Sequence, residues 1–287
     1  MQLHVGGVPE HFNLPWQLAI EQNKFQEAGI DLNWSYYSGG TGEMVGKLND
    51  GELDLAILLT EGFLSAFSKG LNAVIVKEYI TSPLVWGIFT GTNSSIDSIY
   101  APQAKRIAIS RKGSGSHLMA LVHAEQRGES LSDYELVEIK SMAGAVESLT
   151  KQESDIFYWE KYNTKPHVTS GELRMIGEFS APWSGFLIVA NKKALSEKAD
   201  AILSALHIMN KACVNFKTNV HAFEALRKRF GMSDADIKNW LNQTVWNSDY
   251  TMKRNSLQNA ANALQRIDGD FKIDSLISMA AEHLTLK

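Results

Sequence analysis

The residues best suited to hold a small molecule lie in two glycine-rich turns. The first turn, Arg111–His117, follows a short apolar strand at 106–110 and precedes an apolar, helix-like run at 118–122. This order leaves backbone N–H groups and hydroxyls directed at one spot, where the helix dipole favours an anion or a polar oxygen. The second turn, Tyr37–Glu43, repeats the layout after a strand at 30–36. We expect two lobes that face one small ligand.

Several other chemistries find little support in the sequence. Cys213 is the only cysteine, which excludes a disulfide framework and a cysteine zinc site within one chain. It lies in an apolar helical pattern, so we expect a buried thiol. The eight histidines are scattered, without the spacing of a zincin helix. There is no phosphate loop and no nucleophile-elbow pattern, although a Ser-His-Asp system stays open. We expect no metal and no cofactor, and we assign no catalytic residue.

Composition limits the class of partner. The chain has 287 residues, 44% of them hydrophobic and 21% charged, as in ordinary soluble proteins. The net charge of −4 gives no basic footprint for nucleic acid, and no apolar run is long enough to span a bilayer. The first residues already resemble a strand, and no signal peptide precedes them. We therefore expect a cytoplasmic monomer, or a periplasmic one if a signal has been removed.

The hydrophobic pattern alternates between strands and helices. Strands at 3–8, 30–36, 53–59 and 73–80 alternate with helices, which predicts a parallel sheet with helices on both sides. A second series begins at 106, with helices at 114–126 and 143–152 and strands at 134–140, 154–160 and 173–179. From 194 the pattern is helical, with Ser196 as the cap of a helix to about Lys217, and with later helices at 221–230, 253–267 and 274–283.

Two turn-rich breaks divide this pattern, at Thr81-Ser82-Pro83 and at 180–185. The first break is followed by an extended run at 84–90, and the second by an extended run at 186–190. The simplest arrangement is an inserted lobe, 87–183, joined to a discontinuous lobe made of 1–86 and 184–287. Two extended crossings of this kind are typical of a hinge with the ligand in the cleft.

The order and spacing of five segments resemble the type II periplasmic-binding-protein fold. The segments are GGVPEHF at 6–12, SGGTG at 38–42, GELDLA at 51–56, ISRKGSGSH at 109–117 and SDIFYWE at 154–160. The chain is most similar to solute-binding proteins of the nitrate, sulfonate, taurine and thiamine-pyrimidine importers, a superfamily that includes thiamine-pyrimidine synthase. The resemblance covers nearly the whole chain. It implies two lobes, each a mainly parallel sheet flanked by helices, two hinge crossings and a helical C-terminal part.

The resemblance places the ligand among loops at the carboxyl ends of the strands, in agreement with the general rule for open parallel sheets. Trp183, on the second crossing, is a further candidate that either lines the cleft or packs the hinge. The positions carried over by the resemblance are His11, Phe12, Trp16, Ser38, Gly39, Gly40, Thr41, Thr60, Glu61, Ser110, Ser114, Ser116, His117, Trp159 and Glu160.

Most of these residues also have an ordinary structural explanation. Ser114 and Ser116 suit helix capping, and Glu61 suits a helix N-terminus. Trp16 either stacks on a ligand or belongs to the core, while His11 either faces the ligand or the solvent. Few arginines lie near the loops and aromatic residues are frequent, which favours a neutral, zwitterionic or aromatic ligand over a strongly anionic one.

We therefore expect a hinge-closing solute-binding protein for a small polar or aromatic-containing metabolite, serving ABC-type uptake through a permease or sensing. The pattern favours binding without chemistry. The alternatives are a cytoplasmic enzyme of the same fold, active in pyrimidine, thiamine-type or related biosynthesis, and a ligand-responsive partner of another protein. In the enzyme, His11, His117, Glu61 and Glu160 are the candidate acids and bases. The departures from the importer pattern are the missing signal peptide and the missing cysteine-rich motif of the synthase.

Overall fold

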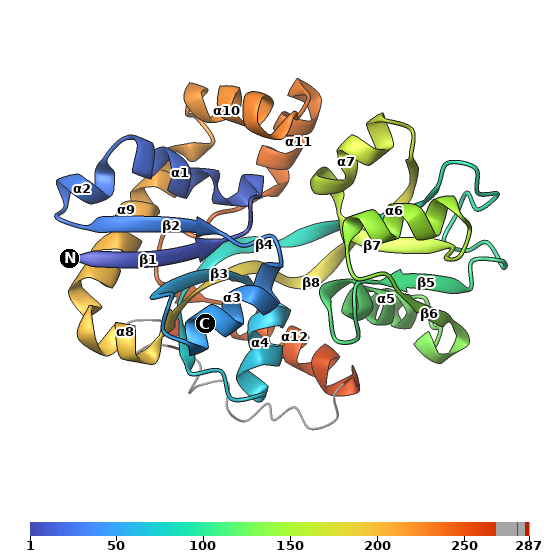
Figure 1. Cartoon of the computed structure of the whole chain (residues 1–287), viewed down its shortest axis with the longest axis horizontal. Coiled ribbons are helices and arrows are strands. Elements are labelled where there is room, and N and C mark those ends of the chain that lie inside the picture. Colours follow the sequence, from blue (N-terminus) through green and yellow to red (C-terminus); the bar gives the residue numbers. More distant parts are fainter. Residues whose placement is uncertain (268–279, 281–284, 287) are drawn as a thin grey trace. The chain divides into compact units, whose positions relative to one another are not determined.

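The computed structural model describes residues 1–267, 280 and 285–286. Their contacts divide the chain into two compact units. Unit 1 contains Met1–Pro83 and Trp183–Ala261, together with residues 280 and 285–286, and unit 2 contains Leu84–Pro182 and residues 262–267. Each unit is an α/β structure with a mainly parallel sheet and flanking helices (Figure 1), which confirms the expected fold class.

Unit 1 has the strand order β2-β1-β3-β8-β4, in which β1 is parallel to β2 and β3, and β8 is antiparallel to β3. A short pair, β9 and β10, is separate from this sheet. The elements of this unit are β1 (Gln2–Gly7), η1 (His11–Asn13), α1 (Leu14–Glu21), α2 (Lys24–Glu27), β2 (Asp31–Tyr36), α3 (Gly40–Asn49), β3 (Leu55–Leu59), α4 (Thr60–Ser68), α8 (Lys192–Glu197), α9 (Ala199–Phe216), α10 (Val220–Phe230), α11 (Asp234–Gln243), β9 (Thr251–Met252) and β10 (Thr285–Leu286).

Unit 2 has the order β8-β4-β7-β5-β6, in which β5 is parallel to β6 and β7, and β4 is antiparallel to β7. Three elements pass from one unit to the other: β4 (Ala73–Gly91), β8 (Leu173–Asn191) and α12 (Arg254–Ile267). The remaining elements of unit 2 are β5 (Arg106–Ile109), α5 (Gly115–Gln126), η2 (Leu131–Asp133), β6 (Glu135–Glu138), α6 (Met142–Thr150), β7 (Ile156–Glu160) and α7 (Lys161–Thr169).

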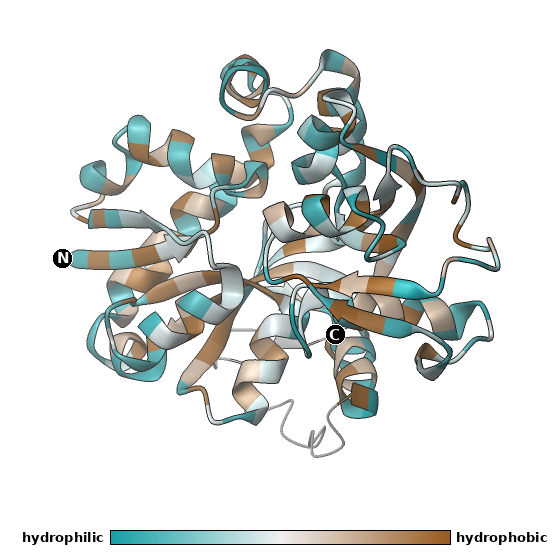
Figure 2. Ribbon diagram, turned by 45° about the vertical axis from the view of Figure 1, so that its right-hand side comes forward, coloured by the Kyte–Doolittle hydropathy of each residue, from teal (hydrophilic) through white to brown (hydrophobic). Residues whose placement is uncertain are grey.

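The two units share one β-α-β-α-β plan. In each, the first strand lies between the second and the third, so the two crossover helices pack on opposite faces of the sheet. In unit 1, α1 packs with α2, α9 and α10, whereas α3 packs with α4 on the other side of the strands (Figure 1). The buried hydrophobic residues come from both strands and helices, and the outer helix surfaces are hydrophilic (Figure 2). Cys213 is buried, as the sequence predicts.

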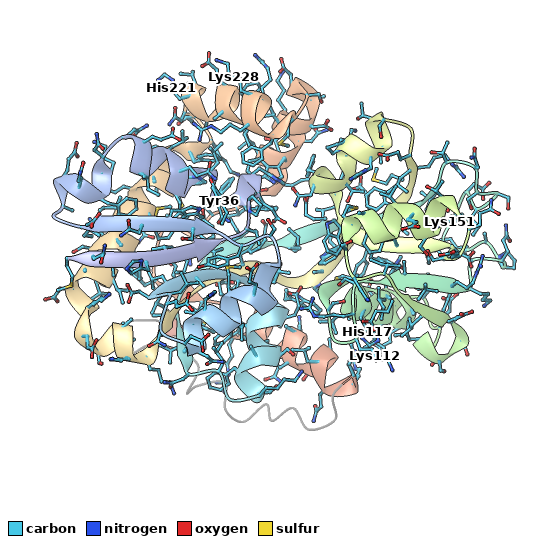
Figure 3. All side chains as sticks on the ribbon, in the orientation of Figure 1. Tyr36, Lys112, His117, Lys151, His221 and Lys228 are labelled. Carbon is cyan, nitrogen blue, oxygen red and sulfur yellow. The ribbon has the colours of Figure 1, made fainter. Side chains whose placement is uncertain are left out.

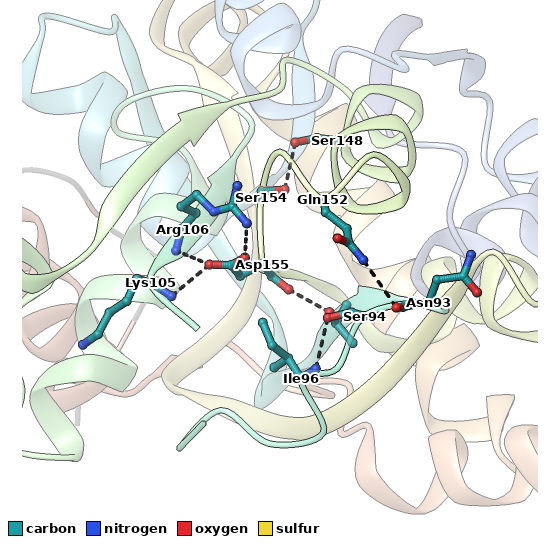
Figure 4. A network of polar contacts seen from close by, with 10 residues as sticks. Asn93, Ser94, Ile96, Lys105, Arg106, Ser148, Gln152, Ser154 and Asp155 are labelled. Carbon is teal, nitrogen blue, oxygen red and sulfur yellow. Dashed lines mark hydrogen bonds and ion pairs between the residues drawn. The ribbon is translucent and has the colours of Figure 1, made fainter. Parts of the chain in front are cut away.

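A buried aspartate begins the third strand of each plan. In unit 2, one carboxylate oxygen of Asp155 accepts the backbone N–H groups of Lys105 and Arg106 at 2.9 and 2.7 Å, and the other accepts the Arg106 guanidinium at 2.6 Å (Figure 4). In unit 1, Asp54 accepts the N–H of His4 at 2.8 Å and pairs with Lys198 at 2.8 Å. Each aspartate therefore joins the start of the third strand to the start of the first.

The two predicted breaks are wrong as strand ends. Both β4 and β8 continue through them, and the passage between the units falls after Pro83 and before Trp183. Pro83 is exposed within β4, where its missing N–H leaves no buried group unpaired. The backbone of the same stretch is held by Val245, whose N–H donates to the Ser82 hydroxyl at 3.0 Å and whose carbonyl accepts the Thr81 N–H at 2.9 Å.

The predicted long helix to about Lys217 is confirmed by α9, but its predicted cap is wrong, because Ser196 lies within the preceding helix α8. The chain forms two helices there, α8 ending at Glu197 and α9 beginning at Ala199. Lys198 interrupts the helical backbone with φ −129° and sends its ammonium group to Asp54. The helices predicted at 221–230 and 253–267 are confirmed by α10 and α12. The helix predicted at 274–283 lies outside the described residues.

Asp155→Ala should lower the free energy of unfolding by about 2 kcal/mol or more, because it leaves two strand-end N–H groups and a partly buried guanidinium without their acceptor. Urea denaturation measures the loss. The control is Lys151→Ala, which breaks an exposed pair with Glu147 and should leave the free energy of unfolding nearly unchanged. Equal effects of the two substitutions would contradict an anchoring role for Asp155.

Candidate functional site

The loop after β5 gathers four of the predicted ligand-binding residues in unit 2. We call Ser110–His117 the serine loop. Ser110, Ser114, Ser116 and His117 are all buried, while the backbone at Gly113 and Gly115 is partly accessible. Because β5 and β7 are parallel neighbours, the serine loop and the end of β7 lie at the same edge of the sheet. The structure therefore brings these residues together with the Trp159–Glu160 segment.

The serine hydroxyls shape the loop from within. Ser116 Oγ accepts the N–H of Ser110 at 2.9 Å and lies 3.0 Å from Ser114 Oγ. Ser114 Oγ caps α5 by accepting the N–H of His117 at 3.4 Å. The first N–H groups of a helix have no partner inside the helix, so the α5 N-terminus retains donors for a ligand oxygen. Here the hydroxyls position the backbone donors.

His117 has a defined tautomer. Its Nδ1 accepts the N–H of Gly113 at 3.0 Å, which requires the proton of the neutral ring to be on Nε2. Gly113 has φ +74°, a conformation that glycine adopts without strain. Burial lowers the pKa of His117, and the positive charge of Lys112 lowers it further. His117 is therefore a neutral hydrogen-bond donor through Nε2 at pH 7.

The serine loop is also the more cationic of the two glycine-rich turns. Arg111 and Lys112 are both exposed, and Lys112 lies at the same end of unit 2 as His117 (Figure 3). Their charges add to the positive end of the α5 dipole. The predicted site contains neither Arg111 nor Lys112, although the sequence shows this basic pair directly before a glycine.

Trp159 and Glu160 end β7 in different roles. The Trp159 ring is partly accessible and stacks on Phe157, with ring centroids 5.2 Å apart, and meets Trp86 edge-on at 6.5 Å. Glu160 is buried and caps α7, because its Oε2 accepts the N–H of Asn163 at 2.7 Å. Trp159 therefore offers a surface at the serine-loop edge of the sheet, while the Glu160 carboxylate has a structural partner.

A second group of predicted residues meets in unit 1. We call Thr41, Thr60, Glu61 and Trp183 the Glu61 cluster. The indole N–H of Trp183 donates to Glu61 Oε2 at 2.9 Å, and the Thr60 hydroxyl donates to the carbonyl of Ser184 at 2.6 Å. Thr41 Oγ1 accepts the N–H of Leu59 at 3.3 Å, and its methyl group lies where a side chain on Gly62 would clash.

Among the residues that the structure describes, no basic side chain pairs with the Glu61 carboxyl group to offset its burial. Desolvation raises its pKa to about 7, and the hydrogen bonds from its own backbone N–H and from Trp183 lower it only in part. Glu61 lies in the first turn of α4, where a negative charge is also favoured by the helix dipole. A carboxyl group that changes charge near neutral pH is typical of functional sites, although burial alone also produces it.

The remaining predicted residues divide into exposed and core positions. Ser38 and Gly39 are exposed, and Gly40 has φ +68°, as the turn before α3 requires. In contrast, Trp16 is fully buried and stacks on Phe25 at 5.7 Å, which favours its core interpretation. The other core positions are His11 and Phe12.

His11 and Phe12 lie in an aromatic cluster of unit 1. The ring of His11 lies 4.6 Å from Trp240 and 5.9 Å from Phe230, and Phe12 lies 5.0 Å from Phe186. Only 1% of His11 is exposed, so the expectation of a loop histidine that faces ligand or solvent does not hold in this conformation. The reason is that Trp240, far away in the sequence, covers the loop.

Sequence reasoning missed a buried polar group beside the Glu61 cluster. The Ser184 hydroxyl donates to Glu78 and lies 2.8 Å from the Ser256 hydroxyl, while the other oxygen of Glu78 accepts the N–H of Lys253 at 3.0 Å. Burial raises the pKa of Glu78. The feature of the sequence that could have indicated this buried group is Lys77-Glu78, two charged residues within an otherwise apolar strand. Among the described residues, no group of three or more His, Cys, Asp or Glu side chains could hold a metal ion.

Comparisons with known proteins define the class of fold. Residues 86–179, about a third of the chain, match a family described as Ca3427-like PBP. Among solved structures, the chain is similar to the CA3427 gene product of Candida albicans, with 27% identity, a TM-score of 0.88, and coverage of 100% of this chain and 98% of that one. That protein is described as defining a new family with the generic periplasmic binding protein fold.

Two sulfonate-binding proteins share the fold at lower identity. The alkanesulfonate-binding protein SsuA of Xanthomonas axonopodis pv. citri, bound to MOPS, is 17% identical with a TM-score of 0.75, over 100% of this chain and 98% of that one. The aliphatic sulphonate binding protein SsuA of Escherichia coli is 15% identical with a TM-score of 0.76, over 100% and 94%. No curated protein matches by sequence. The chain has the type II periplasmic-binding-protein fold, as the sequence resemblance implied.

Glu61→Gln should change how stability depends on pH. Folding raises the pKa of Glu61 from 4.5 to about 7, so the folded protein binds more protons and the wild type loses stability as pH rises between these values. Glutamine removes the loss, so the variant should match the wild type below about pH 4 and exceed it by up to about 3 kcal/mol at pH 8. Thermal and urea unfolding across this pH range measure the difference. Glu224→Gln, at an exposed position, is the control, and parallel pH profiles for all three proteins would refute the assignment.

Proposed function

We propose that this protein binds a small polar or aromatic-containing metabolite and closes its two lobes around it, for ABC-type uptake or for sensing. The fold supports this proposal, because the similar proteins that have a described role are ligand-binding proteins. The observation that carries the proposal is the serine loop, which places the N-terminus of α5 and the neutral ring of His117 at the carboxyl edge of the unit 2 sheet.

The serine loop favours a ligand with an oxygen-rich polar head. The donors there are backbone N–H groups and a neutral imidazole, supplemented by the exposed cations Arg111 and Lys112. A sulfonate, a carboxylate or a polarised carbonyl fits donors of this kind. The partly accessible ring of Trp159 suits the organic part of such a ligand. Affinity would come from backbone donors and stacking, without a bidentate arginine clamp.

The alternative is an enzyme of the same fold, and one observation favours it. Burial raises the pKa of Glu61 to about 7, as expected for a group that exchanges protons near neutral pH, and lowers the pKa of His117, which leaves its ring neutral. They belong to different units, and each also has a structural partner, Trp183 for Glu61 and Gly113 for His117. Binding without chemistry therefore explains the same residues with fewer assumptions.

A ligand panel tests the proposal. Thermal-shift measurements with MOPS, taurine, nitrate, a 4-aminopyrimidine and amino acids should identify one class that stabilises the protein, by about 2.7 kcal/mol at 100 times its dissociation constant. Small-angle scattering should show compaction with that ligand and none without it. Mass spectrometry of the recovered ligand distinguishes the two functions, because an unaltered molecule supports binding and a converted one supports the enzyme.

Compartment and assembly remain predictions with their own tests. Among the described residues, no helix has the length and hydropathy to cross a membrane. Cell fractionation tests the cytoplasmic expectation against the periplasmic one. Light scattering tests for a monomer, and co-purification with a permease tests the transport role.

Substitutions of Ser114 separate ligand binding from helix capping. Ser114→Asn and Ser114→Asp should both keep the cap of α5 and change the free energy of unfolding by less than about 0.5 kcal/mol, whereas Ser114→Ala should cost about 1 kcal/mol. If MOPS binds here, the added charge of Ser114→Asp should weaken MOPS binding at least about tenfold, with a smaller effect of the neutral asparagine. Calorimetric titration provides the measurement. Unchanged MOPS affinity in Ser114→Asp would place the sulfonate elsewhere.

A further inference from the structure

Strand β2 is the edge strand of the unit 1 sheet, because among the described strands it pairs with β1 alone (Figure 1). The backbone N–H groups of Asp31 and Tyr37 donate toward the β1 segment at 2.9 and 3.0 Å. Every second residue of a paired strand bonds to its neighbour, so Leu32, Trp34 and Tyr36 direct their N–H and C=O groups away from β1. Within the described part of the chain, these outward groups have no hydrogen-bond partner.

The same three residues form an apolar row along β2. No residue of the strand is buried, although apolar and polar positions alternate along it. The Trp34 ring lies 5.7 Å from Trp16 of α1 and 6.0 Å from Tyr36, and 52% of Tyr36 is exposed. Gly7 leaves space for the Trp34 ring, since a side chain there would lie 2.5 Å from it. Contacts inside unit 1 therefore fix this row, while β2 stays accessible.

The edge strand of unit 2 has the features that normally prevent pairing between strands. Strand β6 has four residues, and two of them are the exposed glutamates Glu135 and Glu138. Two copies of β6 would bring four carboxylates onto one short ribbon, which is unfavourable. Strand β2 has six residues, with Asp31 at its start as the one charged residue, and it contains no lysine or proline. The open edge of β2 is therefore available for pairing.

A second copy of β2 complements this edge. We consider two β2 strands in antiparallel order, related by a two-fold axis at Trp34. Trp34 then lies opposite Trp34 of the second copy, and Leu32 lies opposite Tyr36. Outward-facing residues that oppose each other exchange two hydrogen bonds, so these three pairs make about six bonds in all. A shift of the register leaves some of these groups without a partner, so the edge selects this one.

The side chains fit the same register. Pairs of aromatic residues, and of an aromatic with an aliphatic residue, stabilise antiparallel strands. Asp31 lies opposite Tyr37 of the second copy, so no like charges face each other. The two Asp31 side chains are separated by six positions along the ribbon, or about 20 Å, and salt screens their repulsion at that distance. The strand is thus complementary to itself in backbone, shape and charge.

We propose that β2 is a dimerisation edge, at which two copies of this protein join their unit 1 sheets through antiparallel β2 strands. The interface is isologous, because each copy contributes the same residues. It replaces the monomer expected from the sequence and is independent of the serine loop. One strand pair buries a small area, so the dissociation constant should be about 10 μM or higher.

A concentration series tests for the dimer. In sedimentation velocity, the wild type should pass from monomer to dimer between about 1 μM and 1 mM. Tyr36→Lys should raise the dissociation constant at least about tenfold, because the symmetric dimer loses two Tyr36–Leu32 pairs and gains a lysine on each edge. The matched control is Tyr100→Lys, at a tyrosine of unit 2 that is 71% exposed, which should dimerise as the wild type does. A wild type that stays monomeric throughout refutes the proposal.

Disulfide trapping tests the register without changing the apolar row. Asn33 and Ser35 bond toward β1, so in the dimer Asn33 opposes Ser35 of the second copy as a non-hydrogen-bonded pair with Cα atoms about 4.5 Å apart. This distance suits a disulfide. A mixture of Asn33→Cys and Ser35→Cys proteins should therefore cross-link in oxidised glutathione, and each variant alone should not. Cys213 is buried and does not compete.

The cross-linking control is a mixture of Asp31→Cys and Ser35→Cys, whose cysteines are offset by two positions in the proposed register. More efficient cross-linking in this control than in the mixture of Asn33→Cys and Ser35→Cys would refute the register. A wild-type dimer with no cross-linking in either mixture would assign the dimer to another surface. Circular dichroism confirms that Tyr36→Lys is folded, and the trapping result decides the question if it is not.

Discussion

The buried carboxylates of Asp54 and Asp155 determine the geometry on which the rest of the structure depends. Asp54 accepts one backbone N–H group from the neighbouring first strand and Asp155 accepts two at the start of its own, and each forms an ion pair with a basic side chain. Strands that begin together also end at the same edge of a parallel sheet. In unit 2 this edge carries the serine loop and Trp159, and in unit 1 it carries Thr60 and Glu61. The positions of the functional loops thus follow from two interactions at the opposite edge.

The sequence predicts those features of the fold that depend on residues close together in the chain. The alternation of strands and helices, the glycine-rich turns and the Ser114 cap could be predicted from neighbouring residues, because strand burial, left-handed turns and helix capping act over a few positions. The continuity of β4 and β8 could not be predicted this way. Pro83 and Gly185 are typical turn residues, yet both strands continue through them because Val245 and the adjacent strands hold the backbone extended.

The same distinction between local and distant contacts applies to the residues of the candidate site. Ser110, Ser114, Ser116 and His117 were predicted as one group because they are close in sequence, and the structure holds them in one hydrogen-bonded loop. The bond between Glu61 and Trp183 joins residues 122 positions apart, and nothing near either residue indicates it. His11 looked like an accessible loop histidine, but Trp240 covers it. Contacts between distant segments decide which predicted side chains are accessible, and a single sequence contains little information about them.

The route of β8 also determines the order in which the protein is assembled during synthesis. Strand β3 must pair with Phe186–Ala190, and Leu59 and its partner Phe186 are separated by the whole main segment of unit 2. At ribosomal speeds of about 5–20 residues per second, that partner emerges roughly 6 to 25 seconds later. Until then, β3 is an apolar strand that can pair only with β1, and its other edge, left without a partner, is a site of aggregation. The main segment of unit 2 is therefore synthesised before the sheet of unit 1 can be completed. A chaperone that shields β3 would act during that interval.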